Sequence, residues 1–522
     1  MAEFVSAKEA VSKIRDHDTV ALGGFGAYGA PDVLLKALAN RYKEESHPRE
    51  ITTVSGISTG DFSEEDVGMN CLAVEGLVGT IIAAHLGNPP RFGALAAGNK
   101  VAAYTLPLGV VCDLFRATAS GKKGVLTSIG LGTCADPRVE GCRVNQKALE
   151  QGREVVKLVT VDGCEQLYYP AFPIHACLIR GSLADRNGSI SIEKEALTAA
   201  DAQIAMAVHN SGGIVIVQVP AVSEELLMPR KVRIHSSLVD YVVVVPEESQ
   251  PQGYAAFYRP ELSGEIRGDA EDLAAMPLSL RKVIARRAAM ELRPGCVINL
   301  GIGIPSGVGA VAHEEGIESL LSLESGPVGG VPLEGMGFAA AVNPQAFMEM
   351  CDALNLYDGG YLDMAFLGAA QIDRKGNVNV SRFGTRCTGP GGFIDITQNT
   401  KKIFFIGTFT AGRSDIRISG GKLEIIQDGE KAKFVDQVQQ ITFSAGYARK
   451  NDQQVTYITE RAVFSLTEEG LKLEEIAPGV DLQRDILGKM GFVPIVSENL
   501  KIMEERIFRE GKMGLSGISI HK

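Results

Sequence analysis

A glutamate beside glycine-rich turns is the side chain of this chain best suited to covalent chemistry. Glu324 follows the apolar run Leu320-Leu-Ser-Leu323 and is itself followed by SGPVGG. In open α/β sheets, ligands bind beyond the carboxyl ends of the strands, so a carboxylate in that place can meet a substrate. A carboxylate can also act as a nucleophile towards a carbonyl carbon. The alternative interpretation is a solvated glutamate in a surface turn.

Two glycine turns could accompany that glutamate. Gly24, Gly26 and Gly29 form G-x-G-x-x-G directly after the apolar run Thr19-Val-Ala-Leu22, the spacing of a dinucleotide-binding loop. The acids about 20 residues further on lie in the charged stretch RYKEES, which does not end a second strand. A second copy, NLGIGIP, begins at Asn299 and has no third glycine. The repeat therefore indicates that both glycine turns bring backbone N–H groups close to an anionic oxygen, and it argues against an NAD or FAD site.

A serine offers a second, weaker candidate nucleophile. Ser58 lies in Gly56-Ile-Ser-Thr-Gly60, which matches the G-x-S-x-G elbow of esterases and thioesterases. The motif is short, and no H-G-G-G segment precedes it. We favour a simple turn at the end of a strand.

Composition excludes several classes of protein. The chain has 522 residues, a net charge of −11 and short Lys/Arg runs, which argues against nucleic acid and anionic membranes as partners. Its nine cysteines form no CxxC pair, and the first residues, MAEFVSAKEA, carry no signal-peptide pattern. The eight histidines show no metal-ligand spacing. We expect a cytoplasmic protein without a metal site or a membrane helix.

Internal similarity predicts the architecture. Two segments run turn, strand and G-x-G, and a second pair, Asp185-Arg-Asn-Gly-Ser-Ile and Asp373-Arg-Lys-Gly-Asn-Val, runs turn and strand. Short β-rich apolar runs, such as Ile214–Val219, are typical of buried parallel strands. We predict two tandem, structurally similar open α/β domains, 1–245 and 277–522, joined by a linker at 246–276, with the active site at their junction.

Seven motifs together identify a family. They are GGFGAYGAP at 23–31, GLGTCADPRVEG at 130–141, NLGIGIP at 299–305, LESG at 323–326, DGGYLD at 358–363, GPGGFID at 389–395 and TERAVF at 459–464. In this order they resemble family I coenzyme A transferases, and most closely the fused-chain propionate (acetate or lactate) CoA-transferases. The first motif resembles the opening of the α-type half, and NLGIGIP, LESG, DGGYLD and GPGGFID resemble the β-type half.

The resemblance implies a mechanism and a set of site residues. Glu324 would become a glutamyl-CoA thioester while CoA moves between short-chain acids such as acetate, propionate, butyrate and lactate, without a further cofactor. Asn299 would contact the oxyanion, with Gly24, Gly26 and Gly29 as the facing wall. Gly301, Gly303, Gly391 and Gly392 would lie against CoA. The partners would be acyl-CoA and short-chain carboxylates, and the protein would be a homo-oligomer, a dimer or a tetramer.

Some positions depart from the family pattern. Leu108 replaces the glutamine of an L-P-Q-G segment, Cys134 replaces an aromatic residue, and Ser55-Gly56 replaces the asparagines of the ketoacid-specific branch. These changes concern the acyl group and leave the preferred acid open. Two alternatives to transfer also remain: an acyl-CoA hydrolase that uses Glu324 or Ser58, and a non-catalytic binder of CoA or a nucleotide.

Overall fold

The computed structural model describes residues 2–268 and 276–515, which form two compact units. The first unit combines the residues up to Gly268 with Glu324–Asn355 and Ser381–Asp395. The second unit contains residues 276–323, Leu356–Val380 and the described residues from Ile396 onward. Two stretches of the predicted C-terminal domain thus pack in the first unit. Of the predicted linker 246–276 and C-terminal domain, residues 269–275 and 516–522 lie outside the described residues.

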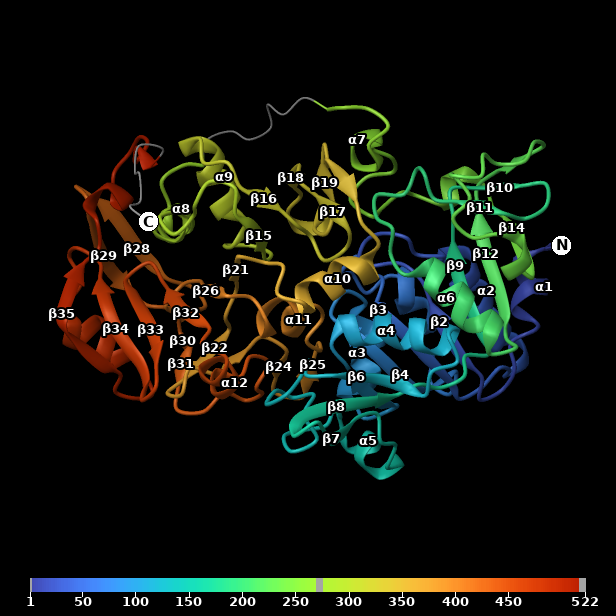
Figure 1. The fold of residues 1–522 in the computed structure, drawn as a ribbon, viewed down its shortest axis with the longest axis horizontal. Helices are drawn as coiled ribbons and strands as arrows, with labels where there is room; N and C mark the ends of the chain where they lie inside the picture. The colour runs from blue at the N-terminus through green and yellow to red at the C-terminus, as the bar shows by residue number, and fades with distance from the viewer. Residues whose placement is uncertain (1, 269–275, 516–522) are drawn as a thin grey trace. The chain divides into compact units, whose positions relative to one another are not determined.

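The first unit is built on an eight-stranded sheet in which all neighbouring strands are parallel (Figure 1). In spatial order the strands are β1 (Glu3–Phe4), β14 (Tyr241–Val244), β12 (Ile214–Val219), β9 (Ala176–Arg180), β2 (Thr19–Leu22), β3 (Ile51–Ile57), β4 (Val78–His85) and β5 (Ala102–Thr105). The order reverses between β2 and β9. Such a switch point is where open α/β sheets bind ligands.

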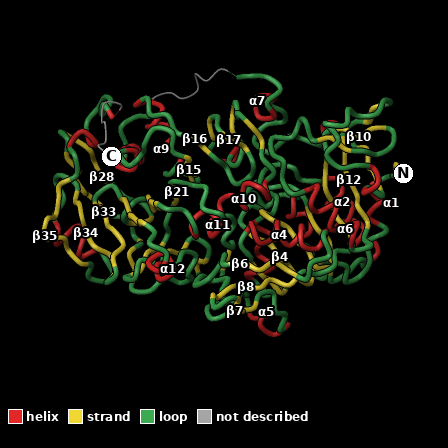
Figure 2. Tube along the Cα trace, viewed as in Figure 1, coloured by secondary structure: helices red, strands yellow, loops and turns green. Residues whose placement is uncertain are grey.

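Helices cover both faces of this sheet. One apolar core joins the strands to α1 (Ala7–Val11), α2 (Asp32–Glu45) and α3 (Pro90–Ala97). Two further helices, α4 (Leu108–Ala119) and α6 (Asp201–Asn210), pack against each other and against β3, β4, β9 and β12. Figure 2 shows these helices interspersed with the strands of the unit. The strands are nearly continuous in apolar residues because they are buried on both faces.

The second unit contains another eight-stranded sheet. Its order is β16 (Leu320–Leu321), β15 (Val297–Leu300), β21 (Met364–Leu367), β26 (Lys402–Ile406), β32 (Gln454–Ile458), β33 (Ala462–Thr467), β34 (Gly470–Ile476) and β35 (Ile495–Ile502). The first five strands are parallel, and β33 is antiparallel to both of its neighbours. The helices α8 (Leu280–Ala289) and α9 (Ser306–Glu315) flank β15 in sequence. The order reverses at β15, directly before NLGIGIP leaves the sheet.

The predicted similarity of the two halves is confirmed by their local topology. In the first half, β10 (Leu183–Asp185) pairs antiparallel with β11 (Ile190–Ser191) and parallel with β13 (Val222–Ser223). In the second half, β22 (Gln371–Asp373) pairs in the same way with β23 (Val378–Asn379) and β31 (Phe434–Val435). Asp185 accepts hydrogen bonds from the backbone N–H groups of Asn187 and Ser189. Asp373 accepts the equivalent bonds from Lys375 and Asn377. The same turn chemistry therefore produces the same small sheet twice.

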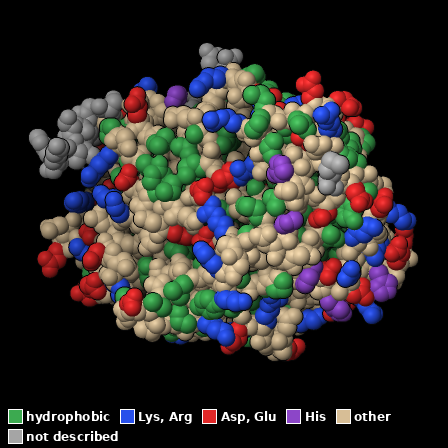
Figure 3. Space-filling view, turned by 45° about the vertical axis from the view of Figure 1, so that its right-hand side comes forward, with side chains coloured by type: hydrophobic (Ala, Val, Ile, Leu, Met, Phe, Trp, Pro, Cys, Tyr) green, Lys and Arg blue, Asp and Glu red, His purple; other side chains and the backbone are tan. Residues whose placement is uncertain are grey.

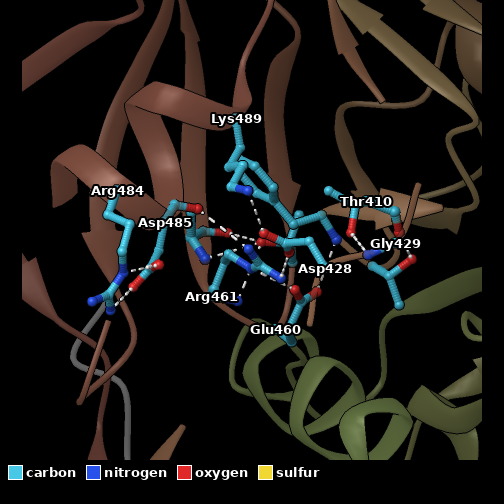
Figure 4. A network of polar contacts seen from close by, with 12 residues as sticks. Thr410, Asp428, Gly429, Glu460, Arg461, Arg484, Asp485 and Lys489 are labelled. Atoms are coloured by element: carbon cyan, nitrogen blue, oxygen red, sulfur yellow. Dashed lines mark hydrogen bonds and ion pairs between the residues drawn. The ribbon is translucent and has the colours of Figure 1, made fainter. Parts of the chain in front are cut away.

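The TERAVF motif stabilises the second unit through a buried ion cluster (Figure 4). The Arg461 side chain is fully buried, with ion pairs to Glu460 at 2.8 Å and to Asp428 at 2.7 Å. Its guanidinium lies 5.0 Å from the centre of the Phe409 ring, and Glu460 accepts the Phe409 N–H at 2.8 Å. Figure 4 also shows Lys489, which pairs with Asp428 at 3.3 Å. Each buried charge thus has an opposite charge beside it, as burial requires.

Charged side chains of both signs lie on the surface (Figure 3). On this face, Lys and Arg side chains are interspersed with Asp and Glu side chains. Across residues 2–268 and 276–515, no helix combines the length and the apolar character that a membrane span requires.

Candidate active site

Glu324 lies in a turn that its neighbours hold in place. The adjacent strand β16 ends at Leu321, so the glutamate follows it by three residues and is itself partly buried. Ser325 is fully buried, and its hydroxyl donates to the Ala339 carbonyl. Gly326 has φ of 120° and accepts the Met348 N–H at 2.9 Å. Only glycine fits here, because an added Cβ would lie 2.4 Å from the Met348 oxygen. The turn therefore holds the Glu324 backbone in one conformation.

Asn299 supports the chain just before this glutamate. It is the third residue of β15, and its side chain is 1% exposed. Its Nδ2 donates at 3.0 Å to the carbonyl of Ser322, whose hydroxyl bonds to that of Tyr357 at 2.8 Å. One N–H of the predicted oxyanion donor thus holds the backbone two residues before Glu324. Gly301, two residues after Asn299, donates its N–H to Phe366 at 2.8 Å, and Gly303 is exposed with φ of 82°.

The first glycine turn follows β2 at the switch point of the first sheet, next to β9. Gly24, Gly26 and Gly29 have φ of 88°, 58° and 73°, which explains the glycines. The Gly24 N–H donates to Asp201 Oδ1 at 3.3 Å, and the Gly26 N–H donates to the Ile57 carbonyl at 3.3 Å. Both groups are occupied within the protein, so this turn offers close backbone approach more than free donors.

Asp201 is a member of this site that our sequence reasoning missed. It opens α6, is 6% exposed, and lies so near the turn that a Cβ on Gly23 would be 2.4 Å from its Oδ1. Burial raises its pKa to about 7, and the hydrogen bond from Gly24 opposes this shift. An aspartate at a helix start is usually a cap, so the sequence carried no signal of this contact.

The segment that begins at Glu324 packs against the glycine turn. The Tyr28 hydroxyl donates to the Gly337 carbonyl at 3.0 Å. The Phe25 and Phe338 rings lie 6.4 Å apart, and a Cβ on Gly26 would lie 3.2 Å from Phe338 Cζ. Residues from both halves of the chain therefore meet within the first unit.

The GPGG loop joins the same unit. The Gly391 N–H donates to the Ala84 carbonyl at 2.9 Å, and the Gly391 carbonyl accepts the Leu108 N–H at 3.0 Å. A Cβ on Gly391 would lie 3.4 Å from Ile57 Cδ1 and 3.8 Å from His85 Cβ. Gly392 is buried beside it. The loop thus lies at the carboxyl ends of β3 and β4.

Asp395, which closes the GPGGFID motif, fixes the segment that carries Leu108. Its Oδ1 accepts the Gly109 N–H at 2.9 Å at the start of α4. Burial raises the Asp395 pKa to about 8. A Cβ on Gly56 would lie 3.0 Å from Leu108 Cδ1, so two of the positions that depart from the family pattern are neighbours. Changes at those two positions would act on one place in the structure.

Ser58 has surroundings unlike those of a catalytic serine. It is fully buried, and its hydroxyl pairs with the hydroxyl of Ser55 at 3.2 Å. Its N–H donates to the His85 carbonyl at 2.9 Å. Among the hydrogen bonds of the described residues, no histidine ring contacts the Ser58 hydroxyl, although a serine nucleophile requires such a base.

Comparison with known proteins assigns the family. The model of the family described as Coenzyme A transferase matches residues 4–245. A caffeate CoA-transferase from Acetobacterium woodii is 42% identical, with 99% of each chain covered. The acetate CoA-transferase YdiF of Escherichia coli O157:H7 is 43% identical, with 98% of this chain and 96% of the relative covered.

Solved structures agree with this assignment. The apoenzyme of the acyl-CoA transferase YdiF from E. coli O157:H7 matches with a TM-score of 0.92 and 42% identity, covering 98% of this chain and 97% of that one. A second structure of that enzyme, described as a thioester complex with CoA, matches with a TM-score of 0.91 and 41% identity, over 98% and 97% of the two chains. The fold, the order of the motifs and the extent of these matches lead to one conclusion: this chain belongs to the coenzyme A transferase family.

Proposed function

We propose that this enzyme exchanges CoA between short-chain acyl-CoA thioesters and short-chain carboxylic acids through a thioester on Glu324. The observation that carries the proposal is the turn Glu324–Gly326, which is fixed in the first unit together with the glycine turn of 24–29 and the GPGG loop. The related E. coli enzyme described as a thioester complex with CoA supports the same covalent chemistry.

The reaction needs only the carboxylate and its two substrates. A Glu324 oxygen attacks the acyl-CoA carbonyl, the C–S bond breaks, and CoA leaves as a thiolate from a mixed anhydride. The thiolate then attacks the glutamyl carbonyl and releases the acyl group as a free acid. A second acid reverses both steps and leaves as its CoA thioester. One thioester replaces another, so neither ATP nor a metal ion is consumed.

Asn299 fits this sequence as a support of the glutamyl group. Each step passes through a tetrahedral oxyanion, and a well-placed donor there is worth about 2.7–4 kcal/mol. Asn299 holds the carbonyl of Ser322, two residues before Glu324, so its removal would disturb the nucleophile as well as any oxyanion contact. The glycines of the 24–29 turn and of the GPGG loop let the substrate approach the protein backbone without a Cβ in the way.

Hydrolysis of acyl-CoA by the same glutamate is the second candidate. Both covalent intermediates react with water, so the two activities differ only in how well water is excluded. With acyl-CoA and no acceptor acid, a transferase should release about one equivalent of free acid per site. A hydrolase would continue to release free thiol.

The experiment uses the intact protein, acyl-CoA and no acceptor. Mass spectrometry should show an adduct of the size of CoA that maps to the peptide around LESGPVGG and is removed by hydroxylamine. Glu324→Gln should form no adduct, and Glu324→Asp should lose at least about 10²-fold in kcat, because its carboxylate is withdrawn by one methylene.

Glu318→Gln is the control. This glutamate is exposed and lies six residues before Glu324, so its substitution should leave both the adduct and the turnover unchanged. An acyl-sized adduct on Ser58, or full turnover of Glu324→Asp, would refute the proposal.

A further inference from the structure

A cavity in the first unit combines an apolar lining with an arginine. Its volume is about 110 Å³, whereas one water molecule needs only about 10–15 Å³ of such space. Buried apolar side chains make up much of its wall: Ile82, Leu106, Leu114 and Val155. The first belongs to β4, the next two come from just before α4 and from α4 itself, and the last follows α5 (Gln146–Gln151). The cavity is therefore large enough for a small organic molecule with an apolar part.

Arg153 is the cation in the wall of this cavity. It follows Gly152, which ends α5 in a left-handed conformation, and its side chain is partly buried. The guanidinium carbon lies 5.1 Å from the centre of the Phe172 ring, which also lines the cavity. Within the described part of the chain, no carboxylate pairs with this guanidinium and no carbonyl accepts a hydrogen bond from it. Burial lowers the pKa of Arg153, as expected for a charge without a counter-ion, whereas charges inside proteins are normally paired.

The acidic groups nearby do not supply the missing counter-ion. Glu154, the carboxylate in the wall of the cavity, is exposed and pairs with Lys157 at 2.9 Å, a contact that lowers the Glu154 pKa. Burial raises the pKa of Tyr104, and its hydroxyl donates to the Ala148 carbonyl at 3.0 Å, so the phenol is neutral. The charge of Arg153 therefore remains available to an anion.

We propose that this cavity is a second ligand site, which binds a small monocarboxylate with its carboxylate on Arg153 and its alkyl tail against the apolar wall. A guanidinium presents a fork of N–H donors that matches a carboxylate. One cation suits a single negative charge, and burial of the alkyl tail against Leu106 and Leu114 adds to the affinity. None of the residues that line the cavity belongs to the Glu324 turn, the glycine turn of 24–29 or the GPGG loop. The inference therefore goes beyond the proposed transfer chemistry and does not depend on it.

The test is a fluorine NMR titration of the intact protein with trifluorobutyrate in the absence of acyl-CoA. For a ligand of this size we expect a Kd on the order of 1 mM. Trifluorobutanol has the same tail without the charge, and trifluoroacetate has the charge without the two methylenes. Each should bind at least about tenfold more weakly, because each loses one of the two contributions.

Variants separate the cavity from the Glu324 site. Arg153→Met keeps an apolar stem but removes the charge, and it should weaken the binding of trifluorobutyrate by about tenfold or more. Ala171→Leu places a larger side chain in the wall of the cavity and should also weaken binding, although Arg153 is unchanged. Arg186→Met is the matched control: it removes the same charge from an exposed position in the turn before β11, and it should leave the affinity unchanged.

A crystal structure with trifluorobutyrate should place the carboxylate beside the Arg153 guanidinium. Equal affinity in the wild type and Arg153→Met, equal binding of trifluorobutanol, or only water or chloride beside Arg153 would overturn the inference. Arg153 would then serve only to pack on the Phe172 ring. Failure of the proposed function gives a different result, because the lack of a glutamyl adduct would leave the binding of trifluorobutyrate to this cavity unaffected.

Discussion

Gly24→Ala should disrupt the wall of the candidate site at a cost that follows from the geometry. Gly24 has φ of 88°, a conformation that costs an L-residue about 1–2 kcal/mol. The added Cβ would lie 2.7 Å from Thr59 Cγ2 and 2.8 Å from the carbonyl carbon and oxygen of Gly29. Overpacking of this kind costs about 1–3 kcal/mol, and a backbone neighbour cannot rotate away. The free energy of unfolding should therefore fall by about 2–5 kcal/mol.

Gly163→Ala separates the two contributions. Gly163 has φ of 80° and lies in the turn between β7 (Lys157–Val161) and β8 (Cys164–Pro170), in the same unit. No heavy atom lies within 4 Å of its added Cβ, so this variant should lose only the conformational term of about 1–2 kcal/mol. Transfer activity should be lost in Gly24→Ala and kept in Gly163→Ala.

Urea unfolding followed by circular dichroism would measure the difference between these variants. At an unchanged m-value, the midpoint should fall further for Gly24→Ala than for Gly163→Ala. Equal midpoints in the two variants would refute the steric argument. Full activity of Gly24→Ala would refute the role of the turn as a wall of the site.

Two further predictions concern buried charges. Asp201 keeps its proton in the folded protein up to a pKa of about 7 but releases it near 4 when unfolded, so the wild type loses stability as pH rises between these values. Between pH 5 and pH 8 the free energy of unfolding of the wild type should fall by on the order of 2–3 kcal/mol more than that of Asp201→Asn. Thermal midpoints measured across this pH range would test the prediction, and parallel pH profiles of the two proteins would contradict it. Arg461→Met should cost about 3–5 kcal/mol, because the buried Glu460 loses its cation. Arg484→Met, at an ion pair whose arginine is 72% exposed, should cost less than about 1 kcal/mol, and equal midpoints for the two arginine variants would contradict the burial argument.

Local sequence patterns predicted much of this protein because their physics is short-range. The β-rich apolar run Ile214–Val219 forms the strand β12. The paired turns at Asp185 and Asp373 form the same small sheets, since an aspartate, a glycine and a β-branched run suffice to build them. The order of the motifs indicated the family, which the comparisons confirm.

Other features could not be predicted from local patterns. The sequence predicted that Glu324 lies in the C-terminal domain, whereas the segments 324–355 and 381–395 pack in the first unit. Nothing in the sequence indicates that Asp201 and Asp395 accept hydrogen bonds from distant backbone groups.

The sequence alone determined the family, the similarity of the two halves of the chain and the identity of the candidate nucleophile, because each depends on neighbouring residues and their spacing. Only the tertiary structure decided which groups surround the site. Asp201 meets Gly24 across 177 positions of the chain, and Gly109 meets Asp395 across 286. Burial and pairing are set by segments that come together only when the chain folds, so local patterns do not reveal such contacts.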